Sequence, residues 1–327
     1  MGKGTARAFW VRSPGVGEIR SEVLPERAAD QVLVRTLYSG VSRGTETLVF
    51  RGEVPPSQYA QMRAPFQEGE FAGPVKYGYL NVGVVEDGPA ELLNRTVFCL
   101  YPHQTRYVVS KDAAVCVPDG VDPRRAVLAG TVETAVNALW DTPPLVGDRV
   151  TVIGAGMVGC CVAALLAKYP GVHTELVDVD PTKAGVAKAI NATFANPAGA
   201  KKDRDLVFHA SATAEGLQLA LELLAPEGTV TELSWYGDRE VSLGLGGGFH
   251  SGRLSIRSSQ VGAIAPARRR NRSYGDRLAL ALDLLADPVF DALLSGESPF
   301  GQLPEVLADL AAGTRPALCH VIDYSGE

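Results

Sequence analysis

The residues best suited to chemistry form a glycine-rich turn near the middle of the chain. Gly154, Gly156 and Gly159 are spaced as G-x-G-x-x-G, with Met157 and Val158 between the last two. The turn lies between an apolar run typical of a strand and a run with helical spacing, which is the context that dinucleotide binding requires. Gly154 permits a tight turn, Gly156 lets the backbone approach a pyrophosphate, and Gly159 allows close packing of helix on strand. The free N–H groups at the start of the helix complete a predicted phosphate site.

An acidic residue follows this turn at the expected distance. Asp178 ends the next predicted strand, 19 residues beyond Gly159, where a carboxylate accepts hydrogen bonds from the adenosine ribose. Its charge repels a 2′-phosphate, and no arginine follows to bind one, so NAD is expected rather than NADP. Lys183 lies near enough to contact the ribose or tolerate a phosphate, which keeps NADP as the alternative. Ser211, at the end of a later strand, completes the predicted cofactor site. The other interpretation is a glycine turn in an α/β domain without a ligand.

Strand and helix patterns alternate around the turn, from residue 148 to about 262. The predicted strands are 149–154, 174–180, 205–211, 228–235 and 254–262. Helical patterns occupy 156–169, 182–190 and 214–225, and another covers 122–142 before the first strand. This alternation predicts the α/β class, with a doubly wound parallel sheet of Rossmann type.

The first 120 residues have a different sequence pattern, with short β-branched runs separated by Gly, Pro and Asp. Residues 51–74 are expected to be a loop. The tail carries helices at about 273–286 and 302–312 and a last strand at 317–324. We therefore expect a β-rich domain over 1–120, completed by 287–327, and a nucleotide-binding domain over 121–286.

Composition is that of a globular protein: 327 residues, 46% hydrophobic and 21% charged. The net charge of −6 argues against nucleic-acid binding, which usually needs a basic face. Five cysteines without a C-x-x-C pair fit a reducing compartment. We expect a cytoplasmic location, because the sequence shows no signal peptide and no run of roughly 18 apolar residues to span a membrane.

Several motifs resemble those of the medium-chain dehydrogenase/reductase superfamily, the alcohol-dehydrogenase-like proteins, over nearly the whole chain. The segment from Gly44 to Glu53 resembles C-G-T-D…Y-K-G-E, and Gly78 to Val85 resembles G-H-E-x-x-G-x-V. Val146 to Val150 resembles the G-D-x-V approach to the first Rossmann strand, and Leu224 to Val230 resembles L-x-P-G-G. The resemblance implies a GroES-like catalytic domain joined to the Rossmann domain.

The zinc ligands of that superfamily are replaced in this sequence. Ser42 or Arg43 falls at the first ligand position, Tyr79 replaces the histidine, and the third position falls near Gly130 or Thr131. None of these side chains is an ordinary zinc ligand, so we expect no metal. In these features the chain is more similar to the bacteriochlorophyllide dehydrogenase group than to liver-type alcohol dehydrogenases.

Hydride transfer to a carbonyl needs a proton or hydrogen-bond donor at the oxygen, and without zinc a side chain must supply it. The resemblance suggests three catalytic candidates. Thr45 matches the family's proton-relaying hydroxyl, with capping of a turn as the alternative. Tyr79 either donates to the oxyanion or fills the vacated metal pocket. Glu133 sits where the family contacts substrate, and is either an acid with a raised pKa or an exposed helix residue.

Other polar residues have simpler expectations. Glu46 matches a family acid that supports the site by ion pairing, and His103 is expected to be structural. No specific role is expected for His250. Arg268 to Arg270 are expected in a solvated loop, with contact to an anionic substrate as the alternative.

These inferences lead to three functional hypotheses. The first is a zinc-independent, NAD(H)-dependent oxidoreductase that interconverts a secondary alcohol and a ketone. The second is an NADPH-dependent quinone or enoyl reductase, which Asp178 disfavours, and the third is a catalytically silent NAD(H)-binding protein. The resemblance also implies a homodimer through the last Rossmann strand, whose edge would otherwise stay unpaired.

Overall fold

The computed structural model describes residues 4–327 and divides into two compact units. Unit 1 runs to Gly130 and includes 282–286 and 294–327, and unit 2 comprises 131–281 and 287–293. The first division therefore falls inside a helix and not at residue 120. Among the described residues, no helix has the length and apolar character needed to cross a membrane.

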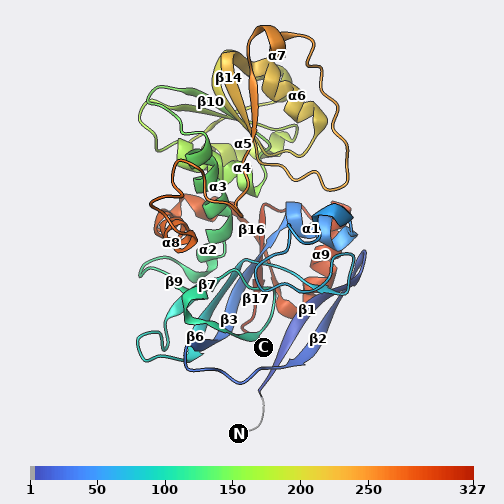
Figure 1. The fold of residues 1–327 in the computed structure, drawn as a ribbon, viewed down its shortest axis with the longest axis vertical. Coiled ribbons are helices and arrows are strands. Elements are labelled where there is room, and N and C mark those ends of the chain that lie inside the picture. Colours follow the sequence, from blue (N-terminus) through green and yellow to red (C-terminus); the bar gives the residue numbers. More distant parts are fainter. Residues whose placement is uncertain (1–3) are drawn as a thin grey trace. The chain divides into compact units, whose positions relative to one another are not determined.

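Unit 1 is built on two mostly antiparallel sheets (Figure 1). One sheet has the strand order β2-β1-β5-β4, and the other has the order β16-β17-β3-β6-β7-β9 with β8 paired to β3. The strands are β1 (Thr5–Ser13), β2 (Val16–Val23), β3 (Gln31–Ser42), β4 (Glu68–Gly69), β5 (Val75–Lys76), β6 (Asn81–Asp87), β7 (Thr96–Cys99), β8 (Arg106–Ser110), β9 (Val115–Cys116), β16 (Leu294–Pro299) and β17 (Cys319–Asp323). Its helices are α1 (Arg43–Arg51), α2 (Pro123–Ala126) and α9 (Leu303–Ala312).

The centre of unit 1 is the strand β3. Alternate residues of β3 are buried, and Val32 and Val34 pack with Val85, Val97 and Tyr107 in one apolar cluster. The tail strand β17 pairs antiparallel with the far end of β3, which places residues 319–323 beside residues 38–42. This end of β3 carries the polar residues of the site described below.

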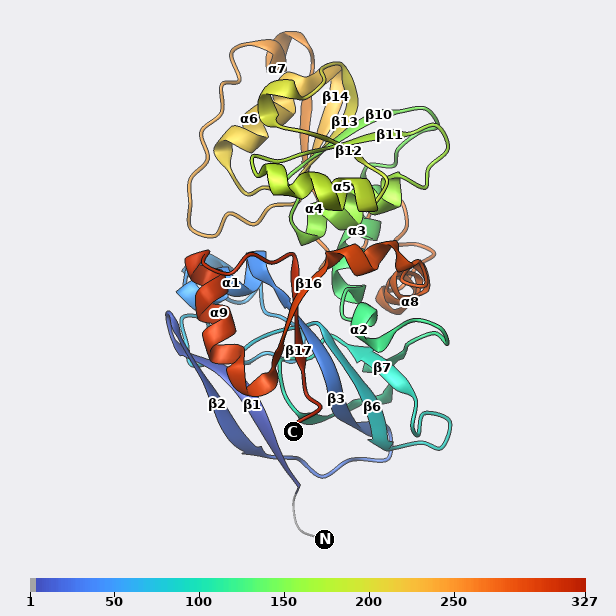
Figure 2. The same ribbon diagram turned by 180° about the vertical axis from the view of Figure 1, so that it is seen from behind.

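Unit 2 is a six-stranded parallel sheet in the order β12-β11-β10-β13-β14-β15. Its strands are β10 (Arg149–Ile153), β11 (His173–Val177), β12 (Thr193–Ala195), β13 (Arg204–His209), β14 (Leu224–Glu232) and β15 (Ser255–Ser258). Its helices are α3 (Ala129–Asp141), α4 (Met157–Leu166), α5 (Ala184–Ala189), α6 (Ala214–Leu223), α7 (Gly248–Ser251) and α8 (Tyr274–Leu284). Figure 2 shows α4 and α5 side by side against strands β10 to β12. The order 3-2-1-4-5-6 is that of dinucleotide-binding sheets and confirms the predicted fold class.

Several boundaries differ from the sequence predictions. The helix expected over 122–142 is divided into α2 and α3, because the Leu128 N–H donates to the carbonyl of Arg125 in a tighter turn. Helix α1 was not predicted, since Gly44 and two threonines give it weak helix propensity. The strand expected over 254–262 is limited to residues 255–258 of β15. The loop expected over 51–74 contains a short 3₁₀ turn and β4.

Candidate active site

The glycine turn of unit 2 has the packing that its motif predicts. Gly154 adopts φ +101°, and a Cβ there would lie 2.7 Å from the backbone nitrogen of Ser211. A Cβ on Gly159 would lie 1.9 Å from the carbonyl oxygen of Gly154, so α4 begins too close to β10 for any side chain. A Cβ on Gly156 would meet only open space. Two glycines are therefore required by packing, and the third leaves room above the turn for a ligand.

Asp178 is bonded to this turn through its carboxylate. Its Oδ2 accepts the Ala155 N–H at 2.7 Å, and its Oδ1 accepts the Asp180 N–H at 2.9 Å. The side chain is half-buried, and a carboxylate offers about four acceptor positions, so it retains capacity for ribose hydroxyls. Lys183 lies 4.0 Å from Asp180. The residues present fit the adenosine end of a nicotinamide dinucleotide.

Beside the turn, the carboxyl ends of β13 and β14 carry a hydrogen-bonded set of which only Ser211 was predicted from the sequence. His209 Nε2 lies 2.7 Å from Ser211 Oγ, and His209 Nδ1 lies 2.7 Å from Glu232 Oε2. Tyr236 donates its hydroxyl to the same Glu232 oxygen at 3.0 Å. Burial acts to raise the pKa of Glu232, but the hydrogen bond and charge of His209, with bonds from Ser234, hold it below the usual value. Ser211 is thus oriented by a buried His–Glu pair.

Glu133 lies inside unit 2 in a buried ion pair. The Arg277 Nε donates to Glu133 at 3.0 Å, and Arg277 also donates to Asn137 at 2.6 Å and to the Val261 carbonyl at 2.6 Å. Burial raises the pKa of Glu133, and the charge of Arg277 partly offsets that rise. The interpretation of Glu133 as an exposed helix residue is wrong, because it is 4% exposed. The pair ties α3 to α8.

In unit 1, the candidates Thr45 and Tyr79 lie together. The side chains of Ser42 and Thr45 lie beside Tyr79, where β3 ends and α1 begins. Burial and then the charge of Glu46 raise the pKa of Tyr79 to about 12. Its phenol therefore stays protonated near neutral pH and remains a donor. Thr45 and Tyr79 are half-buried, whereas Ser42 and Glu46 are fully buried.

Glu46 has two partners that hold it in place. Its Oε1 accepts the backbone N–H of Ser42 at 2.8 Å, and its Oε2 lies 2.8 Å from His103 Nε2. The partner of Glu46 is thus a histidine 57 residues further along the chain. His103 packs on Gly78, where a Cβ would lie 2.9 Å from the imidazole ring, so the glycine at φ +131° makes room for it.

The residues at the zinc positions of the alcohol-dehydrogenase-like pattern do not fit that metal. Tyr79 carries a phenol that stays protonated near neutral pH, and Ser42 offers no thiolate or imidazole. Within residues 4–327, no group of three or more His, Cys, Asp or Glu side chains is arranged to hold a metal ion.

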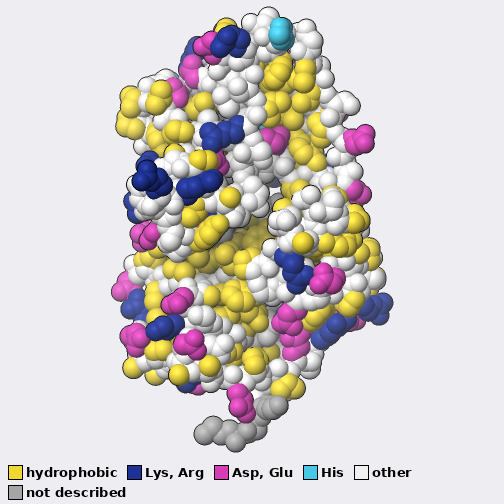
Figure 3. Space-filling model, in the orientation of Figure 1, with side chains coloured by type: hydrophobic (Ala, Val, Ile, Leu, Met, Phe, Trp, Pro, Cys, Tyr) yellow, Lys and Arg dark blue, Asp and Glu magenta, His cyan; other side chains and the backbone are white. Residues whose placement is uncertain are grey.

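The remaining candidates lie on the surface of unit 2. His250 is exposed in α7. Arg268, Arg269 and Arg270 are exposed in the loop before α8, where Figure 3 shows basic side chains gathered.

Comparisons with known proteins agree with this architecture. No family model matches the chain. It is 25% identical over 237 residues to the D-guloside 3-dehydrogenase of Escherichia coli K12, covering 63% of this chain and 67% of that protein. It is 22% identical over 236 residues to the L-idonate 5-dehydrogenase (NAD(P)(+)) of the same strain, covering 68% and 65%.

Solved structures extend the likeness to the whole chain. The crystal structure of L-idonate 5-dehydrogenase from E. coli K-12 matches with a TM-score of 0.81 at 16% identity, covering 99% of both chains. An alcohol dehydrogenase from E. coli CFT073 complexed with NADH matches with a TM-score of 0.77 at 16% identity, covering 99% of this chain and 100% of that one. The chain therefore has the medium-chain dehydrogenase/reductase fold.

Proposed function

We propose that this homologue of NAD(P)-dependent medium-chain dehydrogenases interconverts a secondary alcohol and a ketone with NAD(H) and without zinc. The observation that carries the proposal is Tyr79, a protonated phenol beside Ser42 and Thr45 where the superfamily places a metal ligand. The glycine turn and Asp178 support the choice of cofactor.

When bound, NADH supplies a hydride to the carbonyl carbon, and negative charge develops on the oxygen. Tyr79 donates its proton to that oxygen, with Ser42 and Thr45 orienting the phenol. In unit 2, the N–H groups at the start of α4 would hold the pyrophosphate, and Asp178 would accept hydrogen bonds from the ribose hydroxyls. Ser211, held by His209, would be a further cofactor contact.

In this scheme Glu133 positions helix α3 against helix α8. Its carboxylate is held by Arg277 within a buried network of α3 and α8, so it is not free to exchange protons with a substrate. This role replaces the acid or base hypothesis for Glu133.

The names of the relatives suggest the substrate class. A guloside 3-dehydrogenase and an idonate 5-dehydrogenase are both named for a hydroxyl-bearing carbon of a sugar derivative. We propose a polyhydroxylated secondary alcohol for this chain as well. We also propose a homodimer through β15, an edge strand whose four residues are all exposed.

Cofactor binding is the first test. Fluorescence titration with NADH and NADPH should show NADH binding at least about tenfold more tightly, a difference of roughly 1.4 kcal/mol. Asp178→Ala should remove most of that preference, because it removes the charge that repels the 2′-phosphate. Asp205→Asn, at the opposite end of the sheet, is the control and should retain it. A wild-type preference for NADPH would favour the enoyl reductase hypothesis.

Turnover is the second test. Tyr79→Phe should lower kcat by about 10²–10⁴-fold and leave NADH binding unchanged, because the proton donor is lost. Tyr101→Phe is the control for loss of a buried tyrosine hydroxyl in unit 1. Dialysis against a chelator should leave activity intact. Inactivation restored by zinc would contradict the zinc-free mechanism, and absence of turnover on any alcohol or carbonyl would favour the silent-binding hypothesis.

A further inference from the structure

The carboxyl edge of the unit 2 sheet holds a serine, a histidine and a glutamate in one hydrogen-bonded line. Ser211 Oγ lies 2.7 Å from His209 Nε2, and His209 Nδ1 lies 2.7 Å from Glu232 Oε2. Serine hydrolases use the two ring nitrogens in the same order, with the serine on Nε2 and the acid on Nδ1. Both distances fall in the range at which a base activates a nucleophile. The three side chains therefore have the connections of a nucleophile, a base and an orienting acid.

The acid at one end of this line sets the position of the ring proton. Glu232 accepts the Ser234 N–H at 2.7 Å and the Tyr236 hydroxyl at 3.0 Å, and an ionised carboxylate has no proton to donate. In a neutral His209 ring the proton must then lie on Nδ1, where it is donated to Glu232. Nε2 is left as the acceptor of the Ser211 hydroxyl proton, which is the position of a general base.

The threonine at the other end completes the order of protons. Thr213 Oγ1 accepts the Gly216 N–H at 3.0 Å and lies 3.0 Å from Ser211 Oγ, so the Thr213 hydroxyl donates to Ser211. Ser211 Oγ then donates to His209 and accepts from Thr213, which leaves one of its two lone pairs for a reacting carbon atom.

The local field also favours a negative charge on the serine oxygen. Thr213 is the N-cap of α6, a helix of 10 residues, and a Cβ on Gly216 in its first turn would collide with Ser211 Oγ. The hydroxyl therefore lies against the N-terminal end of the helix, where the positive end of the helix dipole stabilises a developing alkoxide.

Ser211 borders the space that the glycine turn leaves for a ligand. Ser211 and Ala212 are half-buried, and Thr213 is exposed. A Cβ on Gly154 would lie 2.7 Å from the backbone nitrogen of Ser211, and a Cβ on Gly156 of the same turn would meet only open space. A small reactant in that space therefore has Ser211 at its wall.

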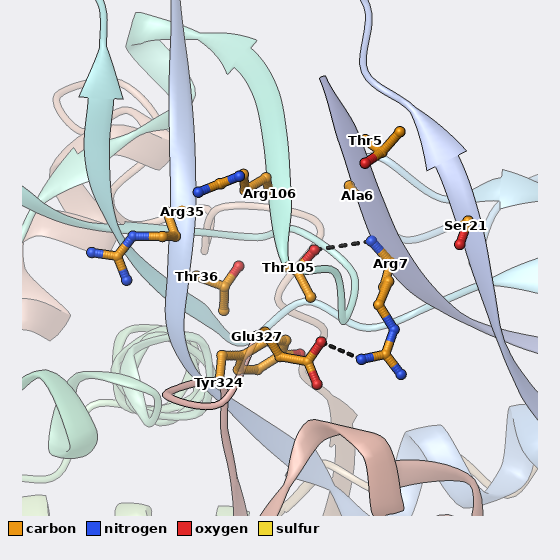
Figure 4. A pocket seen from close by; sticks show the side chains of 10 residues that line it. All are labelled: Thr5, Ala6, Arg7, Ser21, Arg35, Thr36, Thr105, Arg106, Tyr324 and Glu327. Atoms are coloured by element: carbon orange, nitrogen blue, oxygen red, sulfur yellow. Dashed lines mark hydrogen bonds and ion pairs between the residues drawn. The ribbon is translucent and has the colours of Figure 1, made fainter. Parts of the chain in front are cut away.

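Unit 1 contains the same residue types without these features. Glu46 contacts Nε2 of His103 and Ser39 contacts Nδ1, which reverses the order of unit 2. Ser39 is 1% exposed and also lies 3.0 Å from the hydroxyl of Tyr324. A pocket of about 270 Å³ in unit 1 is lined by 10 residues, among them Tyr324 but neither Ser39 nor His103 (Figure 4). Ser39 is therefore an internal control, a serine with the same partners that no reactant reaches.

We propose that unit 2 has a second activity, in which Ser211 takes the acyl group of a small carboxylic ester and passes it to water. Ser211 Oγ attacks the carbonyl carbon of the ester as its proton moves to His209 Nε2, and Glu232 stabilises the imidazolium. The Thr213 hydroxyl is a donor for the oxyanion that forms. The tetrahedral intermediate then expels the alcohol oxygen, which takes the proton from His209, and an acyl-serine remains.

Water completes the cycle by the same route. His209 takes a proton from a water molecule as the water oxygen attacks the acyl carbon, and Ser211 Oγ leaves and recovers that proton. The net reaction is hydrolysis of an ester to an acid and an alcohol. No step uses NAD(H), so this activity does not rest on the proposed dehydrogenase function.

Labelling with an alkyl fluorophosphonate tests the nucleophile directly. With an activated serine this reagent forms a P–O bond and loses fluoride, while the serine proton moves to the histidine. Peptide mass spectrometry of the labelled wild-type chain should find the phosphonyl group on Ser211 and not on Ser39. No label on Ser211, or equal labelling of Ser39, would overturn the proposal. This result needs no variant and no cofactor.

Variants separate activation of Ser211 from its exposure. His209→Gln should slow the labelling of Ser211 by about 10²-fold or more, because the base is lost. Glu232→Gln should slow it as well, because the ring is no longer held in one tautomer. Ser298→Ala, which removes a buried serine 2.9 Å from His320, is the control and should leave the rate unchanged. Circular dichroism checks that each variant folds. Equal rates in wild type and His209→Gln would mean that Ser211 is exposed but not activated, which also overturns the proposal.

Turnover of 4-nitrophenyl acetate provides the second readout. The wild type should release a burst of nitrophenolate as Ser211 is acylated, followed by a slower steady rate as water removes the acyl group. Ser211→Ala should lose the burst, and a burst of the same size in that variant would rule out this serine as the nucleophile. Titration of the same samples with NADH tests the proposed function separately, so either proposal fails without the other.

Discussion

The two units each contain a Glu–His–Ser chain, built from the same three residue types in different surroundings. In unit 1, Glu46 contacts Nε2 of His103, and Ser39 contacts Nδ1 of the same ring. In unit 2 the two ring nitrogens are used the other way round: Glu232 contacts Nδ1 of His209, and Ser211 contacts Nε2. The chain of unit 1 lies within the sheet and continues to Tyr324. The chain of unit 2 passes through Ser211, which is half-buried at the carboxyl edge of the parallel sheet, and ends at the exposed Thr213, whose hydroxyl lies 3.0 Å from Ser211 Oγ.

Because their surroundings differ, the two Glu–His–Ser chains serve different uses. A buried polar group must find a protein partner, because leaving it unpaired costs free energy, and so the unit 1 chain is satisfied along its whole length. At a sheet edge, solvent or a ligand replaces a missing partner. The unit 2 chain therefore orients one hydroxyl outward at the edge where dinucleotides bind. The unit 1 chain instead connects Glu46 at one end with Tyr324 at the other.

The largest expected effect is the loss of Glu46. Glu46→Ala leaves the N–H of Ser42 and the ring N–H of His103 buried without an acceptor, and should lower the free energy of unfolding by about 3–5 kcal/mol. Urea unfolding followed by circular dichroism measures this loss. Glu232→Ala should cost less, since its side chain is 11% exposed rather than 3%.

The control for this comparison is Glu70→Ala, which removes an exposed carboxylate paired with Arg63 and should cost less than about 1 kcal/mol. Equal losses for Glu46→Ala and Glu232→Ala would contradict the distinction between an interior chain and an edge chain.

The losses of stability caused by Ser39→Ala and Ser211→Ala should differ by a smaller amount. Ser39→Ala leaves His103 Nδ1 and the Tyr324 hydroxyl without a partner and should cost about 1–3 kcal/mol. Ser211→Ala should stay within about 0.5 kcal/mol, because water replaces the hydroxyl at the edge. Thermal unfolding of both variants checks this order. A Ser211→Ala variant as unstable as Ser39→Ala would show that water does not reach the unit 2 chain either.

The sequence could predict the parts of the site that depend on local pattern. The turn from Gly154 to Gly159 and the acid at Asp178 lie within 25 residues, and each follows from strand, turn and helix signals close by. The parallel sheet followed from the alternation of strands and helices. Tyr79 was identified because it replaces a histidine in a family motif.

The interior chain could not be predicted in the same way. Ser39 and Tyr324 are 285 residues apart and meet only because β17 pairs with β3. His103 appeared as a lone histidine because its partner Glu46 comes from a helix that was not predicted. One signal for the unit 2 chain was available: His209 and Glu232 end neighbouring parallel strands in direct register, so two polar residues at consecutive strand ends indicated a pair.

The smallest expected effect is a pH dependence carried by the edge chain. Burial acts most strongly on the pKa of Glu232 and raises it, but the hydrogen bond and charge of His209 together with the bonds from Ser234 outweigh burial, so the pKa is lowered in the folded protein. Its stabilisation is therefore complete above the unfolded value of about 4.3 and is lost as the pH falls through the lower folded value. Glu232→Gln keeps the side-chain volume and removes the charge, so the difference in unfolding midpoint between wild type and variant should be constant near neutral pH and shrink below about pH 4. Urea unfolding from pH 7 to pH 3 measures it. A difference that grows towards acid pH would mean that Glu232 is destabilised as a carboxylate, and that burial, not His209, dominates the edge chain.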